Sequence, residues 1–136
     1  MKRGKLFLRG FIAFLITINL FTAAHAEIQT YEGVGEYLMT DETVDFAKNQ
    51  SELAAQRDIL DKICVYVKGQ SIMIDNELDN DEIITISAGI LHVIETKHYF
   101  ESEVDGILVK ALVTAKIDTE ELNNLLEQEI KSRLSK

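Results

Sequence analysis

The segment "ILHVIETKHYFESEVDGILVKALVTAKID" at residues 90–118 carries the clearest structural pattern in the chain. Two β-forming runs, about Ile90–Glu101 and Ile107–Ile117, flank Asp105-Gly106, a dipeptide that favours a tight hairpin turn. Alternate residues of the second run are apolar and would share one face: Ile107, Val109, Ala111, Val113, Ala115 and Ile117. The opposite face holds Lys110, Thr114 and Lys116, with Leu108 and Leu112. We therefore expect a hairpin with one face packed on helices and the other mostly in water.

A third strand is predicted at residues 30–39, where the chain reads "TYEGVGEYLM". Gly33 and Gly35 lie two residues apart and therefore on the same face of this strand. Glycine inside a strand marks the close approach of another element. We expect that element to be a helix that crosses the sheet.

Residues 40–69 predict one long helix, which begins at Thr40 or Asp41 and ends near Gly69. Apolar residues recur at seven-residue intervals and predict the buried stripe: Phe46, Leu53, Leu60 and Val67, with Ile63 and Cys64 beside them. Phe46 and Phe100 are expected to join an otherwise aliphatic core. Arg57 stands among acidic residues in mid-helix, and we expect it to be a structural ion-pair partner whose removal lowers stability.

Residues 75–82, "DNELDNDE", are predicted to form an acidic loop that leads into the apolar segment "EIITISAGI". The β-branched residues of that segment favour a strand, but Asp81 and Glu82 resemble a helix start, and on balance we expect a short helix that ends near Gly89.

A C-terminal helix is predicted to begin at Asp118 or Thr119, with Glu121 placed for a capping box. Its apolar stripe is Leu122, Leu126, Ile130 and Leu134. The predicted fold class is α+β, with a three-stranded antiparallel sheet packed against a long helix, a short helix and a C-terminal helix.

The first 26 residues have the three parts of a secretory signal peptide. Four basic residues precede the apolar run "FIAFLITINLFTA", which ends at Ala24-His25-Ala26. The apolar run is shorter than the roughly 20 residues that span a bilayer. Cleavage is expected after Ala26, so that residues 27–136 form a single α+β domain, exported to the periplasm or secreted and not inserted in the membrane.

Removal of that segment makes the chain strongly acidic. Residues 27–136 keep 10 basic residues against 23 acidic ones, a net charge of −13. Nucleic acids and anionic lipid surfaces repel such a polyanion, so neither is expected to be a major partner.

Cys64 is the single cysteine of the chain and the first candidate for chemistry. A reactive thiolate requires a partner that lowers its pKa, but Cys64 falls near the C-terminal end of the predicted helix, where the helix dipole disfavours a thiolate. A packed core thiol is the preferred interpretation, and an intermolecular disulfide is the alternative.

The acidic loop is the one candidate metal site. Asp75, Glu77 and Asp79 have the alternating spacing that begins an EF-hand, but Asn80 replaces the expected glycine and Ile86 the expected final glutamate. A solvated loop is therefore preferred. His92 and His98 are six residues apart on one predicted strand. They would lie on the same face of that strand but about 20 Å apart, which is too far to share a metal. No cofactor is expected.

Other catalytic motifs are incomplete. "GVG" at residues 33–35 lies in a strand and is followed by Leu38 where a dinucleotide-binding loop has its third glycine. Residues 27–136 contain only two histidines, His92 and His98, so few Ser-His-acid catalytic sets are possible. We therefore expect that the protein is not an enzyme.

The segment "AAQRDILDKICVYV" at residues 54–67 resembles the A-x-R-x-A-x-E-x-x-G-V-Y-[VI] helix end of small exported bacterial proteins. These proteins are related to the N-terminal domain of the flagellar ring protein FlgT and to LPP-type outer-membrane lipoproteins. Ala55, Arg57, Val65, Tyr66 and Val67 match the pattern, whereas Ile59 and Cys64 stand where the family has alanine and glycine. "DNDEIITISAGIL" at residues 79–91 and the closing "VTAKID" are also similar. The signal exit lacks a lipobox cysteine, so this member is expected to be soluble.

The resemblance implies an envelope domain without catalytic activity. Its expected partners are other envelope proteins or a second copy of itself. The alternative is a protein that binds a small ligand or divalent cation through residues 75–82.

Overall fold

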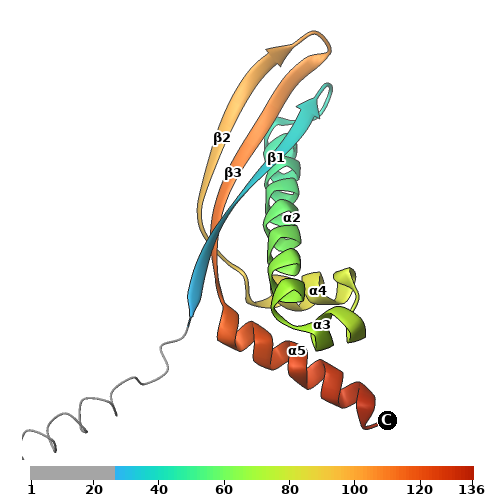
Figure 1. Ribbon diagram of the computed structural model, residues 1–136. Coiled ribbons are helices and arrows are strands. Elements are labelled where there is room, and N and C mark those ends of the chain that lie inside the picture. Colours follow the sequence, from blue (N-terminus) through green and yellow to red (C-terminus); the bar gives the residue numbers. More distant parts are fainter. Residues whose placement is uncertain (1–26) are drawn as a thin grey trace, which may run out of the picture.

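The computed structural model describes residues 27–136, so the predicted signal peptide at residues 1–26 lies outside the described residues. The elements follow in the order β1 (Ile28–Met39), α2 (Val44–Gln70), α3 (Ile72–Glu77), α4 (Asn80–Ile90), β2 (His92–Glu103), β3 (Gly106–Asp118) and α5 (Thr119–Leu134). The three strands form an antiparallel sheet in the order β1-β3-β2. Helix α2 runs along one face of the sheet, and α3, α4 and α5 gather near its C-terminal end (Figure 1). The predicted α+β class is confirmed.

The hairpin of β2 and β3 forms as predicted, but its turn lies one residue earlier than the sequence indicates. Glu103 pairs with Gly106, so Val104 and Asp105 form the two-residue loop. Gly106 is needed for a different reason. A Cβ atom there would collide with the carbonyl oxygen of Met39, at the end of β1.

An irregularity in β2 between Val93 and Glu95 interrupts the alternation of its side chains. His92 pairs with Lys116, which is exposed, whereas His98 pairs with Ala111, which is buried toward α2. The expectation that the two histidines share a face is therefore wrong, because a bulge adds one residue between them.

Helix α2 lies very close to β1, as the two strand glycines predict. A Cβ atom at Gly35 would collide with the backbone of α2 at Ser51 and Ala55, and one at Gly33 would collide with the Ala55 carbonyl oxygen. The α2 residues at this contact are small, because Ala47, Ser51 and Ala55 are all completely buried. Close backbone approach thus replaces large side chains over the first half of the helix.

This approach overturns part of the predicted stripe of α2. Phe46 is 45% exposed and Leu53 is 53% exposed, because the face that meets the sheet there carries only small residues. In the second half of the helix the stripe is correct, since Leu60, Ile63, Cys64 and Val67 are buried. Helix α2 begins after its N-cap Thr43, two or three residues later than the predicted start at Asp41 or Thr40, and ends at Gln70.

The predicted acidic loop at residues 75–82 is wrong. Residues 72–77 form helix α3, and Asn80 begins α4, so that Leu78 and Asp79 alone connect the two helices. Leu78 and Ile74 are buried in the core, which holds this connection in place. The predicted short helix is confirmed as α4.

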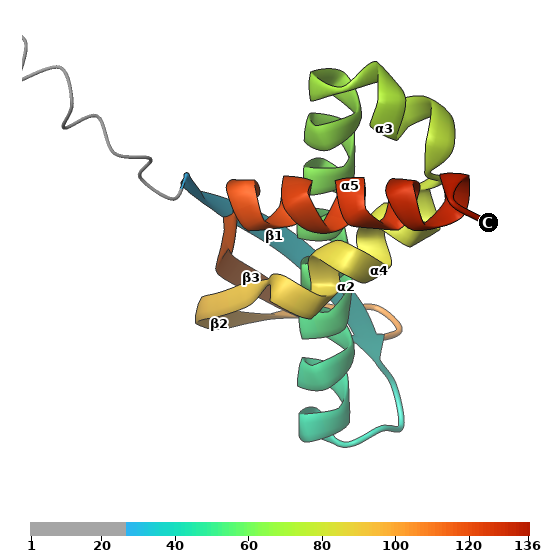
Figure 2. The same cartoon turned by 90° about the horizontal axis from the view of Figure 1, so that it is seen from below.

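Helix α5 begins after Asp118, whose side chain accepts hydrogen bonds from the backbone N–H groups of Glu120 and Glu121. It crosses the end of α2 beside α4 (Figure 2). Leu122, Leu126 and Ile130 are buried, but Leu134 is exposed because it follows the last buried turn. The core therefore lies between the inner face of β3 and the helices α2, α4 and α5.

Candidate functional site

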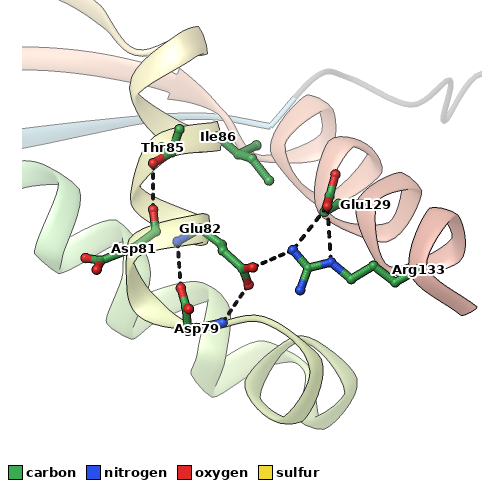
Figure 3. Close-up of a pocket in the computed structure, with 7 residues that line it drawn as sticks. All are labelled: Asp79, Asp81, Glu82, Thr85, Ile86, Glu129 and Arg133. Carbon is green, nitrogen blue, oxygen red and sulfur yellow. Dashed lines mark hydrogen bonds and ion pairs between the residues drawn. The ribbon is translucent and has the colours of Figure 1, made fainter.

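An open groove of about 310 Å³ lies between α4 and α5. Its lining residues come from both helices and from the cap of α4: Asp79, Asp81, Glu82, Thr85, Ile86, Glu129 and Arg133 (Figure 3). Four of these seven residues are acidic and one is basic. The groove therefore has a negative lining around a single guanidinium.

Arg133 joins the two walls of the groove. Its guanidinium forms an ion pair with Glu82 on α4 and bonds to Oε1 of Glu129 on α5, with Nε and Nη2 each 3.1 Å away. A further N–H reaches the carbonyl oxygen of Glu77 at 3.5 Å. The hydrogen bond from Arg133, followed by that from the Asp79 backbone, lowers the pKa of Glu82. The guanidinium is thus engaged by groups of the protein itself, and its role here is structural.

The remaining polar groups on the α4 side of the groove form hydrogen bonds within α4 and its N-terminal cap. The backbone N–H of Glu82 donates to Oδ1 of Asp79 at 2.8 Å, and the backbone N–H of Asp79 donates to Oε2 of Glu82 at 2.9 Å. This is a complete capping box. The Thr85 hydroxyl donates to the carbonyl oxygen of Asp81 at 2.7 Å. The groove is therefore built from interactions that hold α4 and α5 together.

The predicted metal candidates do not converge. Asp75 lies on α3 with an oxygen 3.8 Å from Nζ of Lys68, whereas Asp79 caps α4. Glu77 lies at the end of α3. Residues 27–136 contain no group of three or more His, Cys, Asp or Glu side chains arranged to hold a metal ion.

Cys64 lies in the core, as the helical stripe predicts. Its side chain is 4% exposed and is a free thiol packed among aliphatic residues. Burial raises the pKa of the Cys64 thiol, which favours the unreactive protonated form.

Arg57 forms ion pairs, as expected from its position in α2. Its guanidinium lies 3.3 Å from Oδ1 of Asp61 on the same helix and 3.8 Å from Oδ1 of Asp81 on α4. More than half of the Arg57 side chain is exposed, so the pairs are weakened by solvent.

Contacts between α2 and β2 are features that sequence reasoning did not find. Oε1 of Glu52 lies 2.7 Å from Nε2 of His98, but the two atoms do not form a hydrogen bond, so the contact is an ion pair only when the ring is protonated. Nζ of Lys48 lies 5.8 Å from the centroid of the Phe100 ring. Phe100 is 50% exposed, which corrects its predicted place in the core. No local sequence signal pairs residues so far apart in the chain.

The face of the sheet opposite α2 carries a group of apolar side chains that no described element covers. We call it the outer-face patch, and its members are Val34, Leu38, Tyr99, Leu108 and Leu112. Val34 pairs with Leu112 and Leu38 pairs with Leu108 across β1 and β3. Val34 is 54% exposed and Leu38 is 40% exposed.

Charged side chains cross the outer-face patch at its centre. Nζ of Lys110 on β3 lies 3.5 Å from Oε1 of Glu36 on β1 and 3.1 Å from Oε1 of Glu101 on β2. The pattern of apolar pairs around a polar bridge resembles the mixed composition of protein-binding surfaces.

No protein-family model matches the chain, and no curated protein matches it. The resemblance to the FlgT N-terminal domain and to LPP-type lipoproteins therefore stays a prediction. Within residues 27–136, every helix is too short or too polar to cross a membrane.

Proposed function

We propose that the protein is a non-catalytic domain of the bacterial cell envelope that acts by binding another protein or a second copy of itself. The observation that carries the proposal is the outer-face patch. A three-stranded sheet buries one face under α2 and leaves exposed apolar pairs on the other, and such apolar patches mark interaction sites.

Two further features support a binding role over a catalytic one. The polar groups that line the groove between α4 and α5 are engaged by the capping box of α4 and by ion pairs. The single thiol is buried within the core. The export of the domain rests on the signal-peptide pattern of residues 1–26, and the envelope setting rests on the resemblance stated above.

The test is photo-crosslinking in the intact envelope. The full chain carries p-benzoylphenylalanine at Leu38, inside the outer-face patch, or at Thr30, which is exposed on the same strand and the same face but outside the patch. We expect a crosslinked product from position 38 and much less from position 30. Equal products from both positions, or none from position 38, would contradict the proposal.

A pair of charge variants provides the matched control. Leu38→Glu places a carboxylate in the patch, and Thr30→Glu adds the same charge on the same face. We expect Leu38→Glu to reduce copurification of the crosslinked partner while both variants keep a similar Tm. A loss of the partner in both variants would point to general charge repulsion instead.

A further inference from the structure

The two edges of the sheet differ in how their backbone groups are used. On β1, the N–H of Val34 donates to Oδ2 of Asp58 at 3.1 Å, and Nζ of Lys62 donates to the carbonyl oxygen of Glu32 at 2.7 Å. Asp58 and Lys62 lie on α2 and also pair with each other at 3.0 Å. The centre of the β1 edge is therefore closed to another strand by side chains of α2.

The β2 edge has no such protection. Among residues 27–136, we find no side chain that bonds to the backbone of β2, and β3 is its one neighbouring strand. None of the twelve side chains of β2 is buried, whereas five of the thirteen residues of β3 are. Figure 1 shows β2 at the opposite edge of the sheet from β1, the strand that lies against α2. A long edge strand whose outer backbone groups have no partner among the described residues is a template for further strand pairing.

The side chains of β2 match a second copy of β2 in one antiparallel register. When a two-fold axis passes beside Phe100, Lys97 of each copy lies opposite Glu103 of the other, and Tyr99 lies opposite Glu101. The opposite-charge pair of Lys97 and Glu103, which occurs twice by symmetry, falls within the regular part of the strand, beyond the irregularity between Val93 and Glu95.

The neighbouring registers are less favourable. An axis beside Tyr99 places Glu95 opposite Glu103 of the second copy, and an axis beside His98 places Glu95 opposite Glu101. Like charges directly opposite each other destabilise a strand pair. The register through Phe100 is free of such pairs over residues 97–103, and its one like-charge pair, Glu95 opposite Asp105, places Asp105 in the turn beyond the end of β2.

We propose that β2 pairs with β2 of a second copy in this register, which joins the two sheets into one of six strands. This inference rests on the proposed binding function and names one partner for the β2 edge, which shares only Tyr99 with the outer-face patch. The two α2 helices would lie on the same face of the joined sheet, on either side of the Phe100 pair. Burial of two half-exposed phenylalanine rings side by side would then add to the backbone hydrogen bonds.

The first test measures self-association of the purified protein by sedimentation velocity over a range of concentrations. It is run at about 0.15 M salt, where a screening length of about 8 Å limits repulsion between the acidic copies. We expect a monomer–dimer equilibrium that is weakened roughly tenfold by Lys97→Glu, since each of the two symmetric pairs would become repulsive. Glu103→Lys should weaken the dimer to a similar degree.

The double variant K97E/E103K is the decisive sample, because it exchanges the two charges and restores an opposite-charge pair. We expect it to recover most of the wild-type association. Lys116→Glu is the matched control: it makes the same charge change at an exposed position of β3 and should leave the dimer unchanged. Failure of the double variant to recover association would overturn the register.

A second measurement locates the axis directly. Phe100→Cys is expected to give a disulfide-linked dimer on mild oxidation, whereas Glu32→Cys, on the protected β1 edge and outside the outer-face patch, is not. Cys64 does not interfere because it is buried. A monomer at every concentration, with no linked Phe100→Cys dimer, would overturn the inference. Crosslinking at Leu38 in the envelope would still support the proposed function in that case.

Discussion

At the scale of single residues, Gly35 shows how one missing methyl group sets the distance between α2 and β1. We predict that Gly35→Ala destabilises the fold by about 3 kcal/mol, because the new Cβ would meet backbone atoms of Ser51 and Ala55, which cannot turn aside. Gly89→Ala is the control, since a Cβ there meets nothing within 4 Å and Gly89 lies inside helix α4. That variant should gain about 0.5–1 kcal/mol. Urea unfolding of both variants checks the prediction, and a similar effect of the two changes would contradict it.

Cys64 is the residue whose reactivity the fold suppresses. We predict that the native protein reacts with a soluble thiol reagent far more slowly than the protein unfolded in denaturant, because the thiol is 4% exposed and burial raises its pKa. The rate of colour release from a chromogenic disulfide measures this difference. A native rate close to the unfolded rate would show that α2 opens readily near its C-terminal end.

At the scale of the elements, the connection between β1 and α2 is closed by one carboxylate. Oε2 of Glu42 accepts a hydrogen bond from the Thr40 backbone N–H at 2.9 Å, and Oε1 accepts one from the Tyr37 hydroxyl at 2.8 Å. These contacts, the Thr40 backbone first, lower the pKa of Glu42 to about 2 from its ordinary value of 4.5.

A lowered pKa in the folded state makes this contribution to stability depend on pH. The contribution is complete above the ordinary pKa of 4.5 and is lost as the pH falls toward about 2. We predict that Glu42→Gln is less stable than the wild type at pH 7 and that the difference closes over this range. Unfolding curves from pH 7 to pH 2 test it, with Asp41→Asn as the neighbouring control. A difference that stays constant with pH would contradict the assignment.

Local patterns predicted every described element except α3, because each pattern acts through nearest neighbours. The alternation of β3 and the cap at Asp118 required no knowledge of distant contacts. The predicted buried stripe of α2 is wrong at Phe46 and Leu53 because the buried face of the helix depends on the strand that it contacts. The two glycines of β1 bring the backbones so close that only small side chains, alanine and serine, fit between them. The signal was present in Gly33 and Gly35, but its consequence for the helix could be read only with the two elements placed together.

At the scale of the whole molecule, the candidate surfaces were the least predictable part. Leu108 and Leu112 were correctly assigned to the outer face of the sheet, yet their pairing with Val34 and Leu38 depends on the register between β1 and β3. The groove between α4 and α5 likewise joins residues about 50 positions apart, such as Glu82 and Arg133. The periodicity within one segment gives no information about which residues of a distant segment it contacts.

That long-range ion pair leads to a prediction about the helical end of the molecule. Arg133→Met keeps most of the aliphatic stem but removes the charge that links α5 to α4, and it leaves Glu82 and Glu129 to repel each other across the groove. We expect a lower Tm at pH 7 and a larger drop than for Arg57→Met, because the Arg57 side chain is more exposed and its link to α4 spans 3.8 Å.

The pH dependence of that drop identifies its cause. Arg133 lowers the pKa of Glu82, so the stability that the pair contributes is present above the ordinary value of 4.5 and is lost as the pH falls through the lowered pKa. The Tm difference between wild type and Arg133→Met should therefore shrink on acidification, and added salt should reduce it at pH 7. Thermal unfolding followed by circular dichroism measures both effects. A difference that is unchanged by acid and by salt would mean that the stem of Arg133, and not its charge, joins the two helices.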